Sequence, residues 1–211
     1  MLRQLGRPRL CGSLRAVLTL ALIASLSVAC DFGTIPTPGR SEWTIEEGFE
    51  RGLGEWERGA DVPQDGERPN QTVEWSIELS NEQAKGGQAS ARMFLYGKHD
   101  DGTIWLTRSF ALPARAQYVV HIALDLWSPS ESFNTLGKVA VYTGPRRPTA
   151  EGDFDTSQPA DQAAGWKRYE YQMNTRSDDQ GRLWVAFGIS VVWETKVTYF
   201  IDDVRIEVKP S

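Results

Sequence analysis

Hydrophobic and polar residues alternate with a period of two along most of the chain beyond its first 42 residues. In the segment 118–127 every even-numbered residue is hydrophobic, whereas the odd-numbered positions include Asp125 and Trp127. In the segment 183–191 every odd-numbered residue is hydrophobic, and Trp184 lies on the other phase. Alternation of this kind is typical of β-strands that bury one face, because successive side chains point to opposite sides of a sheet.

Along the whole chain this pattern predicts nine strands and no sustained helix. The predicted strands are residues 43–50, 73–79, 90–97, 103–110, 117–128, 137–144, 167–175, 182–192 and 197–208. The stretches between them are rich in Gly, Pro, Asp, Asn and Ser, most clearly residues 58–71 and 144–165, which favours loops. Nine strands in succession, without an internal repeat, predict a single all-β domain built as a two-sheet sandwich.

The last predicted strand carries an acid on its apolar phase. Phe200 and Val204 share that phase with Asp202. An ionised carboxylate that faces inward costs several kcal/mol unless it is paired or binds a metal. We therefore expect Asp202 to be buried and balanced, either by a cation or by hydrogen bonds, although a β-bulge could turn Asp203 inward in its place. The candidate partners without a metal are Arg92, Arg108 and a tyrosine hydroxyl.

Residues 1–29 have the features of an export signal. Four arginines precede an apolar run, residues 16–29, that is too short to span a membrane comfortably. The chain then reads Leu-Ser-Val-Ala-Cys at residues 26–30, which resembles the lipobox of a bacterial lipoprotein signal with its leucine one place early. The resemblance implies a mature chain that begins at Cys30, lipidated on its sulfur and amino group. The alternative is an ordinary secretory signal cut nearby.

The cysteine count supports the lipidated form. Cys11 lies in the leader, so Cys30 is the only cysteine of the mature chain and has no partner for an internal disulfide. Acyl chains on one residue bind a bilayer strongly, since each buried methylene contributes about 0.8 kcal/mol. We predict that Cys30 holds the protein on a membrane of the bacterial cell envelope, facing outward. Residues 30–41 would then form a tether and residues 42–211 one domain.

The charge of the chain argues against one class of partner. The sequence has 23 Lys and Arg and 28 Asp and Glu, and the leader holds four of the basic residues and none of the acidic ones. With 19 basic and 28 acidic residues, the mature chain would carry a net charge of −9. An acidic chain without a basic cluster in its sequence is a poor candidate for binding nucleic acid.

Six short motifs occur in order along the predicted domain. They are Gly-Phe-Glu-Arg-Gly-Leu-Gly-Glu-Trp (48–56), Gly-Gly-Gln-Ala-Ser-Ala-Arg (86–92), Arg-Ser-Phe (108–110), Ala-Gln-Tyr-Val-Val (116–120), Trp-Lys-Arg-Tyr (166–169) and Tyr-Phe-Ile-Asp-Asp-Val (199–204). In order and spacing they resemble the jelly-roll carbohydrate-binding modules grouped as families 4, 9 and 22. The resemblance spans residues 43–208 and implies a jelly-roll sandwich that binds a glycan.

The same resemblance implies a structural calcium ion that joins the first and last strands. Carried over by position, Glu50 and Asp202 would be its carboxylate ligands, with Glu47 as a further candidate. Calcium takes six to eight oxygen ligands at about 2.3–2.6 Å, and main-chain carbonyls of residues 87–90 could complete the shell. Hydrogen bonding of Asp202 without a metal remains the alternative.

The eight tryptophans suggest where a glycan would bind. Sugar rings present flat C–H faces that stack on exposed indole rings, while nearby polar groups bond the hydroxyls. Three tryptophans oppose the apolar phase of their strands and, with their polar neighbours, could line one concave sheet face. These candidate ligand-binding residues are Trp105, His121, Asp125, Trp127 and Trp184. The alternative for each tryptophan is packing beneath a long loop, such as residues 144–165.

Enzymatic chemistry has little material in this sequence. There are only two histidines, His99 and His121, too few for a histidine metal site and unpromising for a Ser-His triad. No paired-carboxylate signature of a sandwich glycosidase is evident. The sequence therefore predicts a membrane-anchored lipoprotein with a non-catalytic, glycan-binding domain. A structural or adhesive domain that binds protein is the alternative, and a polysaccharide lyase or glycosidase is a third, weaker one.

Overall fold

The structure, a computed structural model, describes residues 42–211. The predicted leader (residues 1–29) and the predicted tether with Cys30 (residues 30–41) lie outside the described residues, so these assignments stay predictions. Within residues 42–211 no helix is long and apolar enough to cross a membrane.

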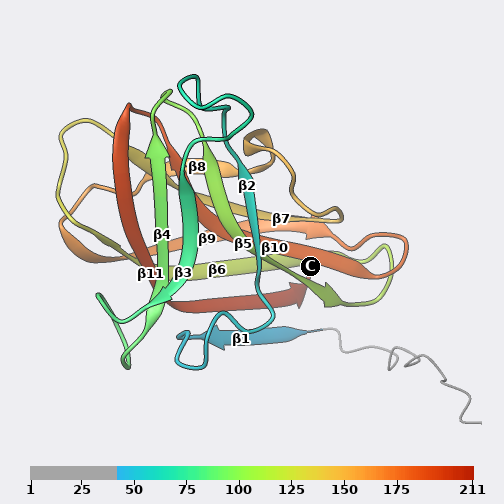
Figure 1. Ribbon diagram of the computed structural model, residues 1–211. Coiled ribbons are helices and arrows are strands. Elements are labelled where there is room, and N and C mark those ends of the chain that lie inside the picture. Colours follow the sequence, from blue (N-terminus) through green and yellow to red (C-terminus); the bar gives the residue numbers. More distant parts are fainter. Residues whose placement is uncertain (1–41) are drawn as a thin grey trace, which may run out of the picture. The chain divides into compact units, whose positions relative to one another are not determined.

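The described part of the chain folds into two antiparallel sheets (Figure 1). Sheet A contains, in spatial order, β3 (Trp75–Ser80), β4 (Ser90–Gly97), β11 (Thr195–Pro210), β6 (Gln117–Ser128) and β9 (Gly165–Arg176), and β1 (Trp43–Glu47) also pairs with β11. Sheet B contains β2 (Glu57–Asp61), β5 (Thr103–Ala111), β10 (Arg182–Val191), β7 (Gly137–Gly144) and β8 (Asp155–Pro159). One 3-10 turn, η1 (Glu151–Asp153), precedes β8. The all-β, two-sheet antiparallel sandwich of the jelly-roll type is confirmed.

Two of these strands have no counterpart among the nine predicted ones. β2 and β8 fall on stretches whose composition favours loops, and they are the two edge strands of sheet B. Their sequences are Glu-Arg-Gly-Ala-Asp and Asp-Thr-Ser-Gln-Pro, and neither strand has a fully buried residue. A strand that buries no side chain needs no apolar alternation, so periodicity could not reveal it.

The hydrophobic core lies between the sheets and contains the apolar phases of the predicted strands. Leu124 and Leu126 of sheet A and Ile104 and Leu106 of sheet B are fully buried in it. The opposite phase of each strand therefore faces outward, and we call the two surfaces it forms the outer face of sheet A and the outer face of sheet B. Any site built from polar-phase residues lies on one of these two faces.

The last strand, β11, changes its phase at a β-bulge. Its pairing with β6 shifts register between Asp202 and Arg205, and Asp203 has a φ of 46°. Ile201 before the bulge and Val204 after it both belong to the core. An extra residue inserted in one strand reverses the alternation beyond it, so even and odd positions exchange faces here.

The bulge corrects one step of the sequence argument. Asp202 lies opposite Asp125 of β6, and Phe200 lies opposite Trp127. Residues directly opposite one another in an antiparallel pair point to the same face, so Asp202 and Phe200 face outward from sheet A. The inference that Asp202 shares the inward face of Val204 was wrong. Its burial is nevertheless confirmed, since Asp202 is 0% exposed.

Candidate functional site

The five residues predicted to bind a ligand do not form one site. His121, Asp125 and Trp127 lie on β6 in sheet A, whereas Trp105 and Trp184 lie on β5 and β10 in sheet B. All five lie outside the core between the sheets. The two groups therefore occupy opposite outer faces of the sandwich, and the expectation of a single concave face was wrong.

On the outer face of sheet A, two of the three predicted ligand residues are held in contacts with other side chains. Asp125 is buried, and its carboxylate accepts a hydrogen bond from Arg168 at 2.7 Å and lies 3.8 Å from the ammonium group of Lys85. Trp127 is half-buried and packs edge-on against its neighbour on β11, with ring centroids 5.5 Å apart. His121 is exposed and lines a separate small cavity of about 220 Å³.

The outer face of sheet B is closed over Trp105. We call residues 145–154, which follow β7, the cover segment. Phe154 in this segment lies against the Trp105 ring, with centroids 4.9 Å apart, and Trp105 is only 2% exposed. On its other side the indole lies so close to Gly59 of β2 that a Cβ there would collide with it. Packing beneath a long loop, the alternative for Trp105, is the arrangement that the structure has.

Polar contacts hold the cover segment at the η1 turn. The Glu151 main-chain N–H donates to Asp61 at 2.8 Å, and its side chain accepts a hydrogen bond from the Ser190 hydroxyl at 3.0 Å. Burial raises the pKa of the Glu151 carboxyl, and the neighbouring carboxyl of Asp101 raises it further, while the bond from Ser190 opposes the rise. The segment is therefore attached to both β2 and β10.

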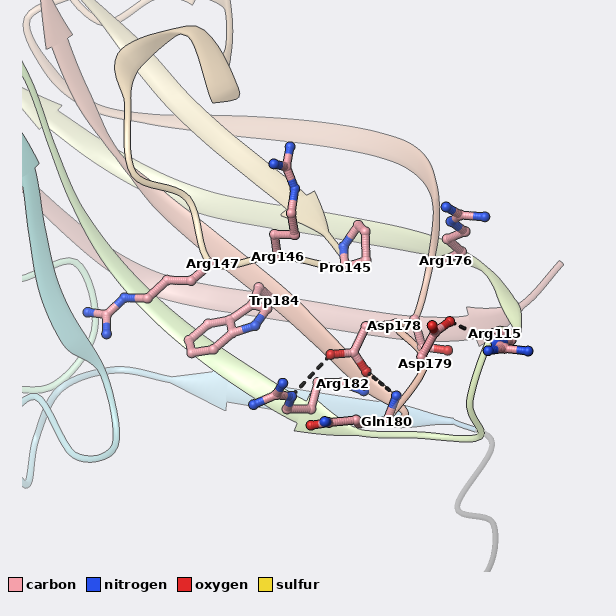
Figure 2. Close-up of a pocket in the computed structure, with 11 residues that line it drawn as sticks. Arg115, Pro145, Arg146, Arg147, Arg176, Asp178, Asp179, Gln180, Arg182 and Trp184 are labelled. Carbon is pink, nitrogen blue, oxygen red and sulfur yellow. Dashed lines mark hydrogen bonds and ion pairs between the residues drawn. The ribbon is translucent and has the colours of Figure 1, made fainter.

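The cover segment leaves Trp184 accessible in the wall of a cavity (Figure 2). This cavity, which we call the Trp184 cavity, has a volume of about 770 Å³, and Trp184 is half-buried in it. The guanidinium carbon of Arg147 lies 5.7 Å from the centre of the Trp184 ring. The cavity is lined by Arg115, Pro145, Arg146, Arg147, Arg176, Ser177, Asp178, Asp179, Gln180, Arg182 and Trp184.

Five arginines of this cavity were not singled out from the sequence. They come from the turn after β5 (Arg115), the cover segment (Arg146 and Arg147), the end of β9 (Arg176) and the start of β10 (Arg182). Only Arg146 and Arg147 are adjacent in the chain, so the sequence contains no basic run that could have indicated the cluster. The fold assembles it from separate strand ends.

The two acids of the cavity are paired with arginines. Asp179 lies 2.7 Å from Arg115, and Asp178 lies 3.1 Å from Arg182. The carboxylate of Asp178 also accepts the main-chain N–H groups of Arg182 at 2.7 Å and Gln180 at 2.8 Å. The hydrogen bond from the Arg182 main chain is the largest of the contributions that lower the pKa of Asp178. Asp178 is thus held in the ionised form.

Two of the three acids predicted to bind calcium, Asp202 and Glu50, bind the loop 81–89, between β3 and β4. Asp202 Oδ2 accepts hydrogen bonds from the main-chain N–H groups of Lys85 at 2.8 Å and Gly86 at 3.1 Å. Its Oδ1 accepts the N–H of Asp203 at 2.7 Å. Burial raises the pKa of Asp202, and these three hydrogen bonds oppose the rise.

Glu50 binds the other half of the same loop. Its Oε1 accepts the N–H groups of Gln88 at 2.9 Å and Ala89 at 3.0 Å. Gly87, which directly precedes these two residues, has a φ of 63°, and a Cβ there would collide with the Glu50 carboxylate. The start and the end of the domain are thus linked, as the sequence suggested, but through the N–H groups of an intervening loop.

As placed, these acids do not fit a calcium site. Glu47 Oε1 accepts the N–H of Phe49 at 2.9 Å, so each of the three carboxylates has at least one oxygen occupied by main-chain donors, which cannot ligate a cation. Within residues 42–211 no group of three or more His, Cys, Asp or Glu side chains is placed to hold a metal ion. Main-chain donors balance Asp202, in place of the arginines or tyrosine considered from the sequence. Calcium binding therefore stays an untested implication of the sequence resemblance, and the contacts of these acids do not favour it.

Comparisons with known proteins add resemblances of fold. No protein-family model matches the sequence, and no curated protein matches it. Among solved structures, the chain is similar to a family 61 carbohydrate-binding module in complex with β-1,4-galactotriose, with TM-score 0.46 and 16% identity over 76% of this chain and 93% of that one. It is similar to the CBM22-1 xylan-binding domain of Paenibacillus barcinonensis Xyn10C, with TM-score 0.45 and 17% identity over 79% and 94% of the two chains.

An enzyme is among the similar structures as well. A cyclase from Fischerella sp. TAU has TM-score 0.47 and 14% identity, over 80% of this chain and 99% of that one. The two modules are of the class that the sequence motifs resemble, and the cyclase is not. At these identities and TM-scores the similarities carry no inference about what this chain binds.

Proposed function

We propose that this chain is a membrane-anchored, extracytoplasmic lipoprotein whose sandwich domain binds a glycan, without cleaving it, at the Trp184 cavity. The observation that carries the proposal is the accessibility of Trp184. Trp105 is closed off by the cover segment and Trp127 packs against β11, whereas Trp184 lines a cavity large enough for sugar rings. A half-exposed indole in a concave site is the expected platform for a sugar face.

The surroundings of Trp184 supply the polar half of a sugar site. Guanidinium groups and the Gln180 amide can donate hydrogen bonds to hydroxyls, and Asp178 and Asp179 can accept them. Because the cavity is wide and its walls are largely exposed side chains, we expect a modest affinity. Dissociation constants in the micromolar to millimolar range correspond to about −8 to −4 kcal/mol.

The acids of the cavity support binding rather than hydrolysis. A glycosidase requires one carboxylic acid that stays protonated and a second, ionised carboxylate. The pKa of Asp178 is lowered by its hydrogen bonds, and Asp179 is paired with Arg115. An acid held ionised cannot protonate a leaving group, so Asp178 does not supply the protonated partner that such a reaction needs.

Affinity electrophoresis in gels that contain polysaccharides tests the site. We expect Trp184→Ala to weaken binding at least about tenfold, a difference of 1.4 kcal/mol, and Trp127→Ala to leave it within about twofold. Trp193→Ala is the matched control, because Trp193 is 50% exposed and does not line the cavity. If Trp127→Ala abolishes binding and Trp184→Ala does not, the site lies on sheet A. Unchanged binding in both variants excludes both residues.

The anchoring half of the proposal rests on the sequence around Cys30 and has its own test. We expect the natural chain to partition into the detergent phase of a Triton X-114 separation and to carry acyl groups on its N-terminal peptide by mass spectrometry. The Cys30→Ser variant should move to the aqueous phase because it lacks the thiol that is acylated. A free thiol at Cys30 in the natural chain would show that the lipoprotein assignment is wrong.

A second candidate function, a structural or adhesive domain that binds protein, is favoured by two exposed aromatic side chains. Phe133 is fully exposed and Trp193 is 50% exposed, in loops joined by a hydrogen bond from Val192 N–H to the Leu136 carbonyl at 3.1 Å. Exposed aromatic rings in adjacent loops are typical of contact surfaces. A photo-crosslinker at position 133 that captures one defined envelope protein, with no binding to any polysaccharide, would favour this function.

A further inference from the structure

The Trp184 cavity is positively charged on an acidic chain. Five arginines and two aspartates line it, whereas the whole chain carries a net charge of −5. Like charges gathered around a concave surface repel one another, and an anion bound among them relieves that repulsion. The local sign of charge is therefore a property of this cavity that favours an anionic ligand.

The arginines are only partly neutralised by the protein. Within residues 42–211, Arg146 and Arg176 form no ion pair, and both are exposed. Arg147 pairs at 2.8 Å with Glu57, which does not line the cavity. In the view of Figure 2, Arg147 and Arg182 lie on two sides of Trp184, and Arg115 and Arg176 both lie at the right, away from the indole ring. Positive charge thus extends along the cavity, away from the indole ring.

We propose that the Trp184 cavity takes an acidic polysaccharide, one whose sugar rings carry carboxylate or sulfate groups. One ring stacks on Trp184, and the acidic groups of the same and neighbouring rings accept hydrogen bonds from the arginines. The guanidinium fork matches the geometry of a carboxylate or sulfate with two parallel N–H donors, and lysine cannot do this. All five cations of the cavity are arginine. This inference rests on the proposed glycan binding at the same cavity.

Two features favour an acidic glycan over other polyanions. The molecule as a whole is acidic, so the surface around the cavity repels a broad polyanion such as a duplex or an anionic membrane, whereas a single polysaccharide chain can lie within the cavity. Trp184 supplies an apolar face at the cavity wall, and sugar rings present matching C–H faces, whereas lipid phosphates do not. A single acidic chain lying along the cavity satisfies both conditions.

Electrophoresis of the full chain through gels that contain defined polysaccharides tests the inference. The acidic probes are polygalacturonate, alginate and chondroitin sulfate, and the neutral ones are β-1,4-galactan, xylan and fully methyl-esterified polygalacturonate. We expect retardation by at least one acidic probe. For polygalacturonate, methyl esterification should abolish it, because the backbone is kept and the charge removed. Raising the salt from about 50 to about 200 mM should weaken binding roughly tenfold, as expected for several charge contacts.

Matched variants assign the effect to the cavity. Arg146→Gln with Arg176→Gln removes two charges that hold no ion pair, so the fold should be unaffected. We expect at least about a tenfold loss of binding to the acidic probe. The control double variant, Arg51→Gln with Lys196→Gln, removes the same charge from exposed residues outside the cavity and should change binding less than about twofold.

The outcomes separate this inference from the proposed function. Equal binding of neutral and acidic probes that depends on Trp184 but not on the arginines overturns the inference and leaves glycan binding intact. Retardation by none of the six probes overturns both. Equal retardation by acidic probes and by double-stranded DNA, unchanged in Trp184→Ala, means ion exchange only and overturns the inference.

Discussion

The two outer faces of the sandwich are covered by different kinds of contact. On sheet A the loop 81–89 is held by polar bonds, since the carboxylates of Asp202 and Glu50 accept four of its main-chain N–H groups. On sheet B the cover segment is held mainly by a ring, since Phe154 packs on Trp105, with polar contacts at Glu151 beside it. The loop 81–89 is held by directional hydrogen bonds, whereas the cover segment is held mainly by packing between aromatic rings.

This difference explains where a ligand can reach the protein. Hydrogen bonds to a buried carboxylate fix a loop tightly in one place, so the outer face of sheet A is occupied by acids and their donors. Ring packing closes only the area beneath the ring, and Trp184 on the same sheet stays accessible in its cavity. The buried Trp105 and the half-exposed Trp184, on neighbouring strands, are thus placed for different roles: Trp105 for stability and, under the proposed function, Trp184 for recognition.

The largest effect is expected from Asp202→Ala, which removes the carboxylate that holds the loop 81–89 on sheet A. Loss of this buried acceptor leaves three main-chain N–H groups without a partner, and we expect a loss of about 3 kcal/mol of unfolding free energy. Urea unfolding followed by circular dichroism measures it. The control is Asp203→Asn, next to it on the surface, where asparagine tolerates the positive φ and the change should stay within about 0.5 kcal/mol. If Asp202→Ala lost no more unfolding free energy than Asp203→Asn, the Asp202 carboxylate would not be what holds the loop 81–89.

Phe154→Ala should weaken the attachment of the cover segment to sheet B. Removing a half-buried ring from its contact with Trp105 should cost about 2 kcal/mol of unfolding free energy. It should also increase quenching of tryptophan fluorescence by acrylamide, and that increase should vanish when Trp105→Phe is added. Phe133→Ala, at a fully exposed ring, is the control that should change neither measurement. No gain in quenching would show that the cover does not protect Trp105.

A smaller effect is expected from the pH dependence of the cover. The folded-state pKa of Glu151 is raised by burial. Its contribution to stability is therefore fully present below the ordinary carboxyl pKa of about 4.3 and is lost as the pH rises through the folded-state value. Relative to Glu151→Gln, the natural chain should become less stable as the pH is raised from about 4 to 7. A difference between the two proteins that is constant with pH would contradict this cause.

The smallest expected effect concerns calcium. Because main-chain donors already satisfy Asp202 and Glu50, we expect neither calcium nor a chelator to shift the thermal unfolding midpoint. A ligand that binds only the folded state must raise that midpoint. A higher midpoint with calcium, absent in Asp202→Asn, would support the calcium site predicted from the sequence and would mean that the loop 81–89 can turn carbonyls toward the acids.

Strand positions could be predicted from the sequence wherever burial imposes alternation, as in residues 117–128. The prediction failed for β2 and β8, which bury no complete side chain. It also misplaced the inward face of β11, because a single residue, Asp203, inverts the phase without any change in the apolar pattern. Asp202 was correctly predicted to be buried, for a reason that the bulge overturns.

The spacing of residues in the sequence could not reveal which side chains gather around Trp184. Trp184 was identified because its strand alternates, but its arginine neighbours come from segments up to about seventy residues away and share no pattern. Trp105 had the same alternation as Trp184, and only the path of the cover segment separates them. Which face a loop crosses depends on tertiary packing, so the sequence could offer the two possibilities but not decide between them.

The pairing of β1 with β11 has a mechanical consequence. Trp43 lies opposite Val208, so the domain begins and ends at the same place, and its indole N–H donates to the Ala111 carbonyl on sheet B at 3.2 Å. Suppose that the chain is pulled from residue 42 while a polymer is bound to sheet B. The short β1–β11 pairing is then the first to bear the force. Trp43 then links the two sheets through its hydrogen bond to Ala111. The force at which the domain unfolds is therefore set by the contacts of β1 rather than by the core.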